Sequence, residues 1–179
     1  MKNKSILLPI IVILLTAAVL LGASAGLSSV RAANIQAEHV RMMQTLLPGS
    51  GDFVREIYTG EDAAVRSVHK AENGFVVETV VDGYAEEIAL MVGVSNDGHV
   101  TGLVVRDMNE TFGLGGNALF DHVFLAQFLN TSGEAEVGGN VDAITGATVT
   151  SRAIARGVNS AIAVVTGADA ASAATSWGG

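Results

Sequence analysis

The sequence has 179 residues, a formal net charge of −8 and no cysteine. Without cysteine, the chain cannot form disulfides, hold iron–sulfur clusters through thiolates or use thiol catalysis, so any redox chemistry needs a bound cofactor. Its acidic balance argues against nucleic acid and anionic membrane surfaces as binding partners. The length allows one domain of roughly 100 to 150 residues beside any terminal segments.

An uncharged, largely apolar run extends from Ile6 to Leu27, after Lys2 and Lys4. As a helix, a run of about 22 residues spans the ~30 Å hydrocarbon core of a bilayer. Basic residues before such a run place the N-terminus in the cytoplasm. We therefore expect residues 1–27 to contain a cytoplasmic start and a single transmembrane helix, with the rest of the chain on the extracytoplasmic side of the cell membrane.

A cleaved signal peptide is the alternative interpretation of the same run. Ala23-Ser24-Ala25 has the small-x-small pattern of a cleavage site, and the two lysines would form the basic start of the peptide. The run is longer than the ~15-residue upper limit of usual signal-peptide cores, which favours a retained anchor. Both interpretations place the following domain on the same side of the membrane.

Residues 28–51 are expected to form a helical stalk that ends at Pro48-Gly49-Ser50-Gly51. Short segments rich in β-branched and aromatic residues follow, separated by turn sequences such as Asn73-Gly74 and Asp97-Gly98, and this pattern predicts an antiparallel meander. Apolar residues occupy both faces of the segment 88–94, so we expect that strand to be buried on both sides. The five predicted strands cover residues 53–58, 65–69, 75–81, 88–94 and 100–106.

A glycine-rich segment, residues 109–117, lies between the last predicted strand and a predicted helix over residues 118–129. The spacing Gly113-x-Gly115-x-x-Ala118 partly matches a dinucleotide-binding turn. That interpretation requires parallel β-α-β units, whereas the preceding strands are predicted to be antiparallel and no second unit follows. Alternatively, the glycines let the backbone approach a flat ring system, with Glu110 and Thr111 hydrogen-bonding its polar edge. A plain strand-to-helix connection is the third possibility.

The hydroxyl-rich segment 142–151 lies directly before an amphipathic helix. Apolar residues of that helix recur at spacings of four, four and three, which predicts a helix over residues 149–165. A helix N-terminus carries unpaired N–H groups and the positive end of the helix dipole, so it favours hydroxyl caps and phosphate groups alike. Arg152 and Arg156 would add positive charge beside it. The segment is therefore either an ordinary capped helix start or a phosphate site.

The run Asp142-x-x-Thr145-Gly146-Ala147-Thr148 resembles the flavinylation motif of the FMN-binding subunits of the Rnf and Nqr respiratory complexes. The loop Glu110–Gly115 and the predicted sheet around Gly83–Gly102 resemble the same family, although the family usually has proline where this chain has Phe112. The resemblance implies that Thr148 carries FMN through a phosphoester bond. It also implies cofactor-binding roles for Asp142, Thr145, Gly146 and Ala147, and for Glu110, Thr111, Gly113, Leu114 and Gly115 in a loop that closes over the flavin.

The motif contains no histidine or cysteine that would activate the hydroxyl of Thr148, and a threonine hydroxyl is a weak nucleophile without an adjacent base. Attachment should therefore need a separate enzyme, which in the family is a magnesium-dependent flavin transferase that uses FAD. Outside the motif, the histidines His69, His99 and His122 stand far apart and lack metal-ligand spacing. We expect no metal site and no catalytic residue of the chain's own.

The expected fold is α+β: a single N-terminal transmembrane helix, then one FMN-binding domain over residues 52–167 with an antiparallel sheet flanked by helices, then a flexible tail over residues 168–179. The resemblance implies an electron-relay role, as the FMN-binding G subunit of a membrane-bound, ion-translocating ferredoxin:NAD oxidoreductase (Rnf) in a prokaryotic cell membrane. Its partners would be the other membrane and redox subunits, and the flavin transferase for maturation. Three alternatives stay open: an Nqr-type subunit, a free-standing membrane-anchored flavin shuttle, and a cofactor-free binding module.

Overall fold

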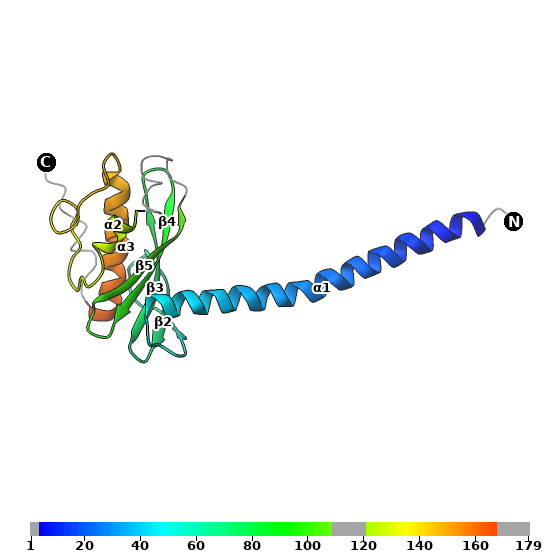
Figure 1. Ribbon diagram of the computed structural model, residues 1–179, viewed down its shortest axis with the longest axis horizontal. Helices are drawn as coiled ribbons and strands as arrows, with labels where there is room; N and C mark the ends of the chain where they lie inside the picture. Colours follow the sequence, from blue (N-terminus) through cyan, green and yellow to red (C-terminus); the bar gives the residue numbers. More distant parts are fainter. Residues whose placement is uncertain (1–3, 109–120, 168–179) are drawn as a thin grey trace. The chain divides into compact units, whose positions relative to one another are not determined.

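The computed structural model describes residues 4–108 and 121–167 (Figure 1). The chain divides into two compact units, Met1–Arg41 and Met42–Gly179. Helix α1, Lys4–Leu46, begins in the first unit and ends in the second. The predicted apolar run and the predicted stalk therefore form one continuous helix. Among the residues whose side chains the structure describes, no helix combines the length and the apolarity needed to cross a membrane.

The second unit contains the predicted antiparallel meander. Its five strands pair in sequence order, β1-β2-β3-β4-β5, and every neighbouring pair is antiparallel. The edge strand β1 is shorter than predicted because its three residues are all exposed and gain little from packing. The strands are β1 Val54–Glu56, β2 Val65–Ala71, β3 Gly74–Asp82, β4 Glu87–Ser95 and β5 Val100–Met108.

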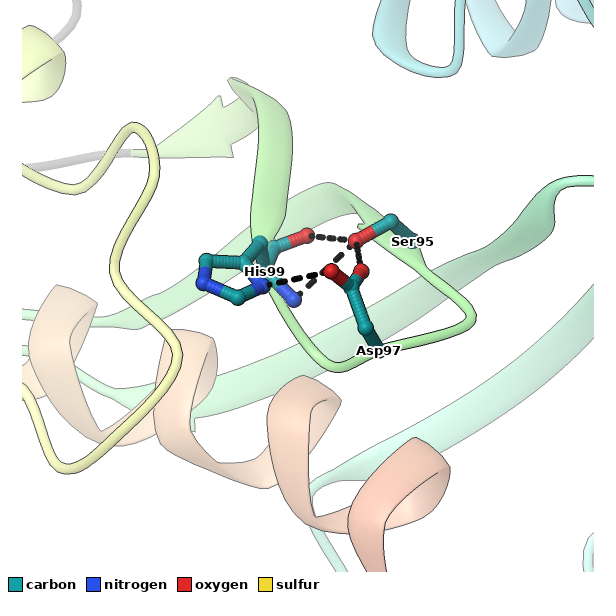
Figure 2. Close-up of polar contacts among 3 residues, drawn as sticks. All are labelled: Ser95, Asp97 and His99. Atoms are coloured by element: carbon teal, nitrogen blue, oxygen red, sulfur yellow. Dashed lines mark hydrogen bonds and ion pairs between the residues drawn. The ribbon is translucent and has the colours of Figure 1, made fainter.

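The hairpin between β4 and β5 turns at Gly98, whose φ of +85° suits glycine. Figure 2 shows the polar contacts that hold this turn. The backbone N–H of His99 donates to Ser95 Oγ at 3.1 Å, and the Ser95 hydroxyl lies against the Asp97 carboxylate. His99 Nδ1 is 3.1 Å from Asp97 Oδ2, which is an ion pair only when the imidazole is protonated, and Nδ1 makes no hydrogen bond. The serine hydroxyl thus faces the carboxylate and not the imidazole ring. Ser95, Asp97 and His99 together stabilise the β4–β5 turn.

One face of the sheet is covered by helix α3, Thr148–Thr166, drawn in orange in Figure 1. The helix packs on β3 and β4. Gly157 permits this close approach, because a Cβ atom there would lie 2.4 Å from Leu90 Cδ1 and 3.0 Å from Thr79 Oγ1. The main core lies between this face and the helix, and its fully buried members include Val77, Ile88, Leu90, Val92, Val94, Val100, Phe128, Ile154, Val158 and Ala161.

The opposite face of the sheet receives the last turn of α1. Leu46 is buried, and its carbonyl oxygen accepts a hydrogen bond from Thr101 Oγ1 at 2.6 Å. Gly93 and Gly102 are cross-strand partners, and a Cβ at Gly93 would lie 2.2 Å from the Leu46 oxygen. Met91, on this same face of β4, is fully buried. Strand β4 is thus buried on both sides, as predicted.

Candidate functional site

The segment Asp142–Ala147 forms a tight turn that leads into α3. The backbone N–H of Ala147 donates to the Ile144 carbonyl at 2.9 Å, which closes a four-residue turn. Gly146 occupies the third position of this turn with φ +77°, a conformation that residues with a Cβ rarely adopt. The backbone conformation of the turn therefore favours glycine at this position of the motif, independently of any ligand.

Thr148 is the first residue of α3, and its side chain is exposed. Thr145 and Asp142 are exposed on the same turn, whereas the methyl group of Ala147 is buried at 5% exposure. The structure thus brings the four motif residues before Thr148 together with it in one compact turn. Thr148 itself is exposed, so a second molecule can reach this residue.

The helix start differs from the expectation in its capping. The N-cap residue of α3 is Ala147, and no side chain makes a capping hydrogen bond. The hydroxyl of Ser151, fully buried one turn inside the helix, instead accepts from the Ile144 N–H at 3.1 Å and contacts the Ala147 carbonyl at 2.9 Å. Thr150 is also buried, at 1% exposure. The side-chain cap of an ordinary capped helix start is therefore absent at Ala147, and the buried Ser151 hydroxyl instead holds the preceding turn together.

Without a side-chain cap, the positive end of α3 is suited to a phosphate group beside Thr148. Arg152 follows four residues later on the same exposed side of the helix, and Arg156 four residues after that. Long side chains on helices generally lean toward the N-terminus, so residues spaced four apart, such as Thr148 and Arg152, can approach each other. A phosphoester of FMN needs an alcohol to form the ester and donors for the remaining phosphate oxygens, and Thr148, the helix end and Arg152 one turn later are residues and groups of these kinds, so the residues present fit this group.

Three carboxamide side chains hold the long irregular segment between α2 (His122–Ala126) and α3. Gln127 accepts from the Asp142 N–H at 2.8 Å, and its Nε2 lies 3.4 Å from the Asp142 carbonyl. Asn159 binds both backbone groups of Ala135, at 2.8 and 3.1 Å. Asn140 binds the Glu136 N–H at 2.7 Å and the Glu134 carbonyl at 2.9 Å. The sequence analysis predicted none of these three contacts. Periodicity indicates only that Gln127 belongs to a helix, and not which backbone groups its side chain binds.

The second half of the predicted site lies outside the described residues. Glu110, Thr111, Gly113, Leu114 and Gly115 all belong to the segment 109–120. On either side, the structure describes Met108 at the end of β5 and Asp121 at the start of α2. The carboxylate of Asp121 caps this helix by accepting from the Phe124 N–H at 2.9 Å. The roles expected for the five loop residues stay predictions.

Residues 83–163 match the FMN-binding domain family. This range contains β4, β5, α2, the turn 142–147 and most of α3. The chain therefore carries the sheet hairpin and the helix start described above as parts of an FMN-binding domain.

Curated relatives define the family further. The G subunit of the Na⁺-translocating ferredoxin:NAD⁺ oxidoreductase complex of Acetobacterium woodii is 39% identical over 102 residues, which cover 51% of this chain and 48% of the relative. The G subunit of the proton-translocating ferredoxin:NAD⁺ oxidoreductase complex of Clostridium ljungdahlii is 38% identical over 99 residues, 51% and 53% of the two chains. These alignments span about half the length of each relative.

A longer alignment joins the chain to the G subunit of the ion-translocating oxidoreductase complex of Methanosarcina acetivorans. The two are 30% identical over 174 residues, which cover 88% of this chain and 91% of the relative. The chain belongs to the family of FMN-binding G subunits of ion-translocating oxidoreductase complexes.

Proposed function

We propose that this protein is an electron-relay subunit that carries FMN, bound covalently to Thr148, in a membrane-bound ion-translocating ferredoxin:NAD oxidoreductase. The observation that carries the proposal is the exposed hydroxyl of Thr148, the first residue of a helix without a side-chain cap and the last residue of the turn motif. The family to which the chain belongs supports FMN as the cofactor and an oxidoreductase complex as the setting.

Each residue of the motif has a distinct task in this proposal. Thr148 Oγ forms the ester, and the N-terminus of α3 with the Arg152 guanidinium stabilises the remaining phosphate charge. Gly146 supplies the left-handed turn, and buried Ala147 anchors it. Bound FMN supplies the redox chemistry that the side chains of this cysteine-free chain lack. Glu110, Thr111, Gly113, Leu114 and Gly115 are proposed to contact the flavin.

Attachment to Thr148 requires a flavin transferase, with FAD as the donor and a magnesium ion. The Thr148 oxygen forms a bond to the phosphorus of the FMN half of FAD, and the pyrophosphate bond to the AMP half breaks. AMP leaves, and the hydroxyl proton of Thr148 is released to a base. The transferase supplies that base, because the motif contains no histidine or cysteine to activate the hydroxyl.

The proposed location is a prokaryotic cell membrane, with the N-terminus cytoplasmic and the FMN domain on the extracytoplasmic side. Support comes from the sequence, where Lys2 and Lys4 precede the uncharged run 6–27. A covalent bond suits this location, since a dissociating cofactor would be lost from the cell. The proposed partners are the other membrane and redox subunits of an Rnf-type complex. Failure to copurify with multi-span subunits from native membranes would instead favour a free-standing shuttle.

The test of attachment compares wild type, Thr148→Ala, Thr148→Ser and Ser132→Ala, each coexpressed with the transferase. Intact mass and in-gel flavin fluorescence of denatured protein should show FMN on wild type and on Ser132→Ala, which changes an exposed serine outside the motif. Thr148→Ser keeps an alcohol and should retain the flavin, whereas Thr148→Ala should lose it completely. Wild type without flavin, or peptide mapping of the flavin to another hydroxyl, would contradict the proposal.

A further inference from the structure

The turn that presents Thr148 is held at two points by side chains from outside it. Ser151 holds its end, because its hydroxyl accepts from the Ile144 N–H and donates to the carbonyl of Ala147, the last residue of the turn. Gln127 ties its beginning, because its carboxamide binds both backbone groups of Asp142, at 2.8 and 3.4 Å. The chain between these two points is only a few residues long. The path of residues 142–147, and with it the position of Thr148, is therefore set from both ends.

Gln127 is itself firmly placed, at the C-cap of α2. The helix is fixed to the main core by Phe124 and Phe128, at 2% and 0% exposure, whose rings meet edge to face with centroids 5.3 Å apart. The Gln127 side chain is only partly buried, so its contribution to the core is small compared with that of the two rings. It acts as a link from a core-anchored helix to the first residue of the turn.

We propose that Gln127 is a positioning residue for flavin attachment, which holds Asp142 so that the turn presents the Thr148 hydroxyl to the transferase in one fixed arrangement. The inference rests on the proposed attachment at Thr148. It adds that the transferase acts on the folded turn and not on a loose peptide. Misplacing a reacting atom by about 1 Å is enough to cost roughly a hundredfold in rate, so two hydrogen bonds at the start of a short turn are sufficient leverage.

The chain offers a matched control in Asn159, which makes the same two-bond contact with the backbone of Ala135, seven residues before Asp142. Gln127→Met and Asn159→Leu replace each carboxamide by an apolar side chain of similar shape. Gln127→Glu keeps the acceptor for the Asp142 N–H and removes the donor to its carbonyl. All three are compared with wild type in the full chain, with purified transferase, FAD and Mg²⁺.

The measurements are kcat/KM of FMN incorporation by intact mass, the unfolding midpoint, and hydrogen exchange of the peptide that contains residues 142–147. We expect Gln127→Met to lower kcat/KM about tenfold or more, with faster exchange in that peptide. Gln127→Glu should fall between Gln127→Met and wild type, about threefold lower than wild type. Asn159→Leu should stay within about twofold of wild type, even where its unfolding midpoint falls as far as that of Gln127→Met.

An unchanged or faster rate in Gln127→Met would overturn the inference, because it would mean that the transferase takes a loosened turn as readily as the folded one. An equal rate loss in Asn159→Leu would overturn it too, since general destabilisation would then explain both. If Gln127→Met does not fold, the rate of Gln127→Glu replaces it in the test, and a wild-type rate in Gln127→Glu would overturn the inference. Wild type that gains no FMN at Thr148 would remove the proposed function itself, which is a separate outcome.

Discussion

The carboxyl group of Asp97 stabilises the β4–β5 turn in its charged form. Its pKa lies below the usual value of 3.8, chiefly because the Ser95 hydroxyl hydrogen-bonds to it, with further contributions from its own backbone N–H and from His99. A carboxyl with a lowered folded-state pKa stabilises the fold above its unfolded-state pKa, and this stabilisation is lost as the pH falls through the folded-state pKa. Asp97 is exposed, so the effect is small and sensitive to salt.

We therefore expect Asp97→Asn to be less stable than wild type near neutral pH and to approach wild type in acid below the usual carboxyl pKa. Denaturant unfolding of both proteins across this pH range, at low ionic strength, measures the difference directly. Asp107→Asn, a change of the same kind outside the turn, serves as the comparison. A difference between wild type and Asp97→Asn that is the same at every pH would show that the charge of Asp97 is not responsible.

Single residues also show where sequence reasoning ends. The motif 142–148 is recognisable because its residue types stand in fixed order, and the structure gathers them in one turn. The hydroxyl that shapes the turn cannot be chosen in the same way. Thr148, Thr150 and Ser151 all stand near the helix start, and only the folded backbone shows that Ser151 faces Ile144 while Thr148 is exposed.

Gly93, in the interior strand β4, permits the close contact between the sheet and the end of α1. An added Cβ would lie 2.2 Å from the Leu46 carbonyl oxygen and 2.7 Å from Thr101 Oγ1. The first of these neighbours is backbone, so the helix end or the strand must move. We expect Gly93→Ala to lower the free energy of unfolding by about 1 to 3 kcal/mol, as overpacking usually does.

The measurement for Gly93→Ala is denaturant unfolding, with Gly133→Ala as the control. Gly133 has open space around its would-be Cβ, so alanine there should be close to neutral. Gly93 lies on the sheet face away from α3, and flavin incorporation at Thr148 should therefore proceed in the folded fraction of Gly93→Ala. Full stability of Gly93→Ala would mean that the end of α1 packs on the sheet less closely than the structure has it.

At the scale of elements, the periodic patterns of the sequence predicted the helices and strands that local interactions determine. The predicted helix 149–165 is α3, and all five predicted strands are present. The helix predicted over 118–129 has its described part in α2, His122–Ala126, because the chain turns after Gln127 and reaches a left-handed conformation at Asn130, with φ 63°. The carboxamide contacts of Gln127 and Asn159 join residues 15 and 24 positions apart. Contacts at such separations leave no periodic pattern in a sequence.

At the scale of the whole molecule, the chain divides after Arg41, and the second unit includes the last turn of α1. We expect a fragment that begins at Met42 to fold and to accept FMN at Thr148. A fragment that begins at Pro48 lacks Met43, Leu46 and Leu47, which are all at most 5% exposed. At about 1.5 to 3 kcal/mol for each buried side chain, this loss should greatly reduce stability or prevent folding.

Circular dichroism melts and in-gel flavin fluorescence of the two fragments measure both expectations. Equal unfolding midpoints for the fragments would show that the apolar residues at the end of α1 contribute nothing to the second unit. Failure of the longer fragment to fold would show that the domain depends on residues before Met42. The first result would place the start of the folding unit after Leu47, and the second would place it before Met42. The pair of fragments therefore locates that start.

The end of α1 is held to the sheet by the hydrogen bond from Thr101 to the Leu46 carbonyl, next to the cross-strand glycines Gly93 and Gly102. This contact determines where a mechanical force on α1 would act. A force applied to the chain before Met42 would reach the second unit at Leu46, which contacts strands β4 and β5. Helix α3 and its Thr148 end stand on the other face of the sheet, away from this line of force. We therefore expect a force on the chain before Met42 to leave the orientation of the N-terminal end of α3 largely unchanged.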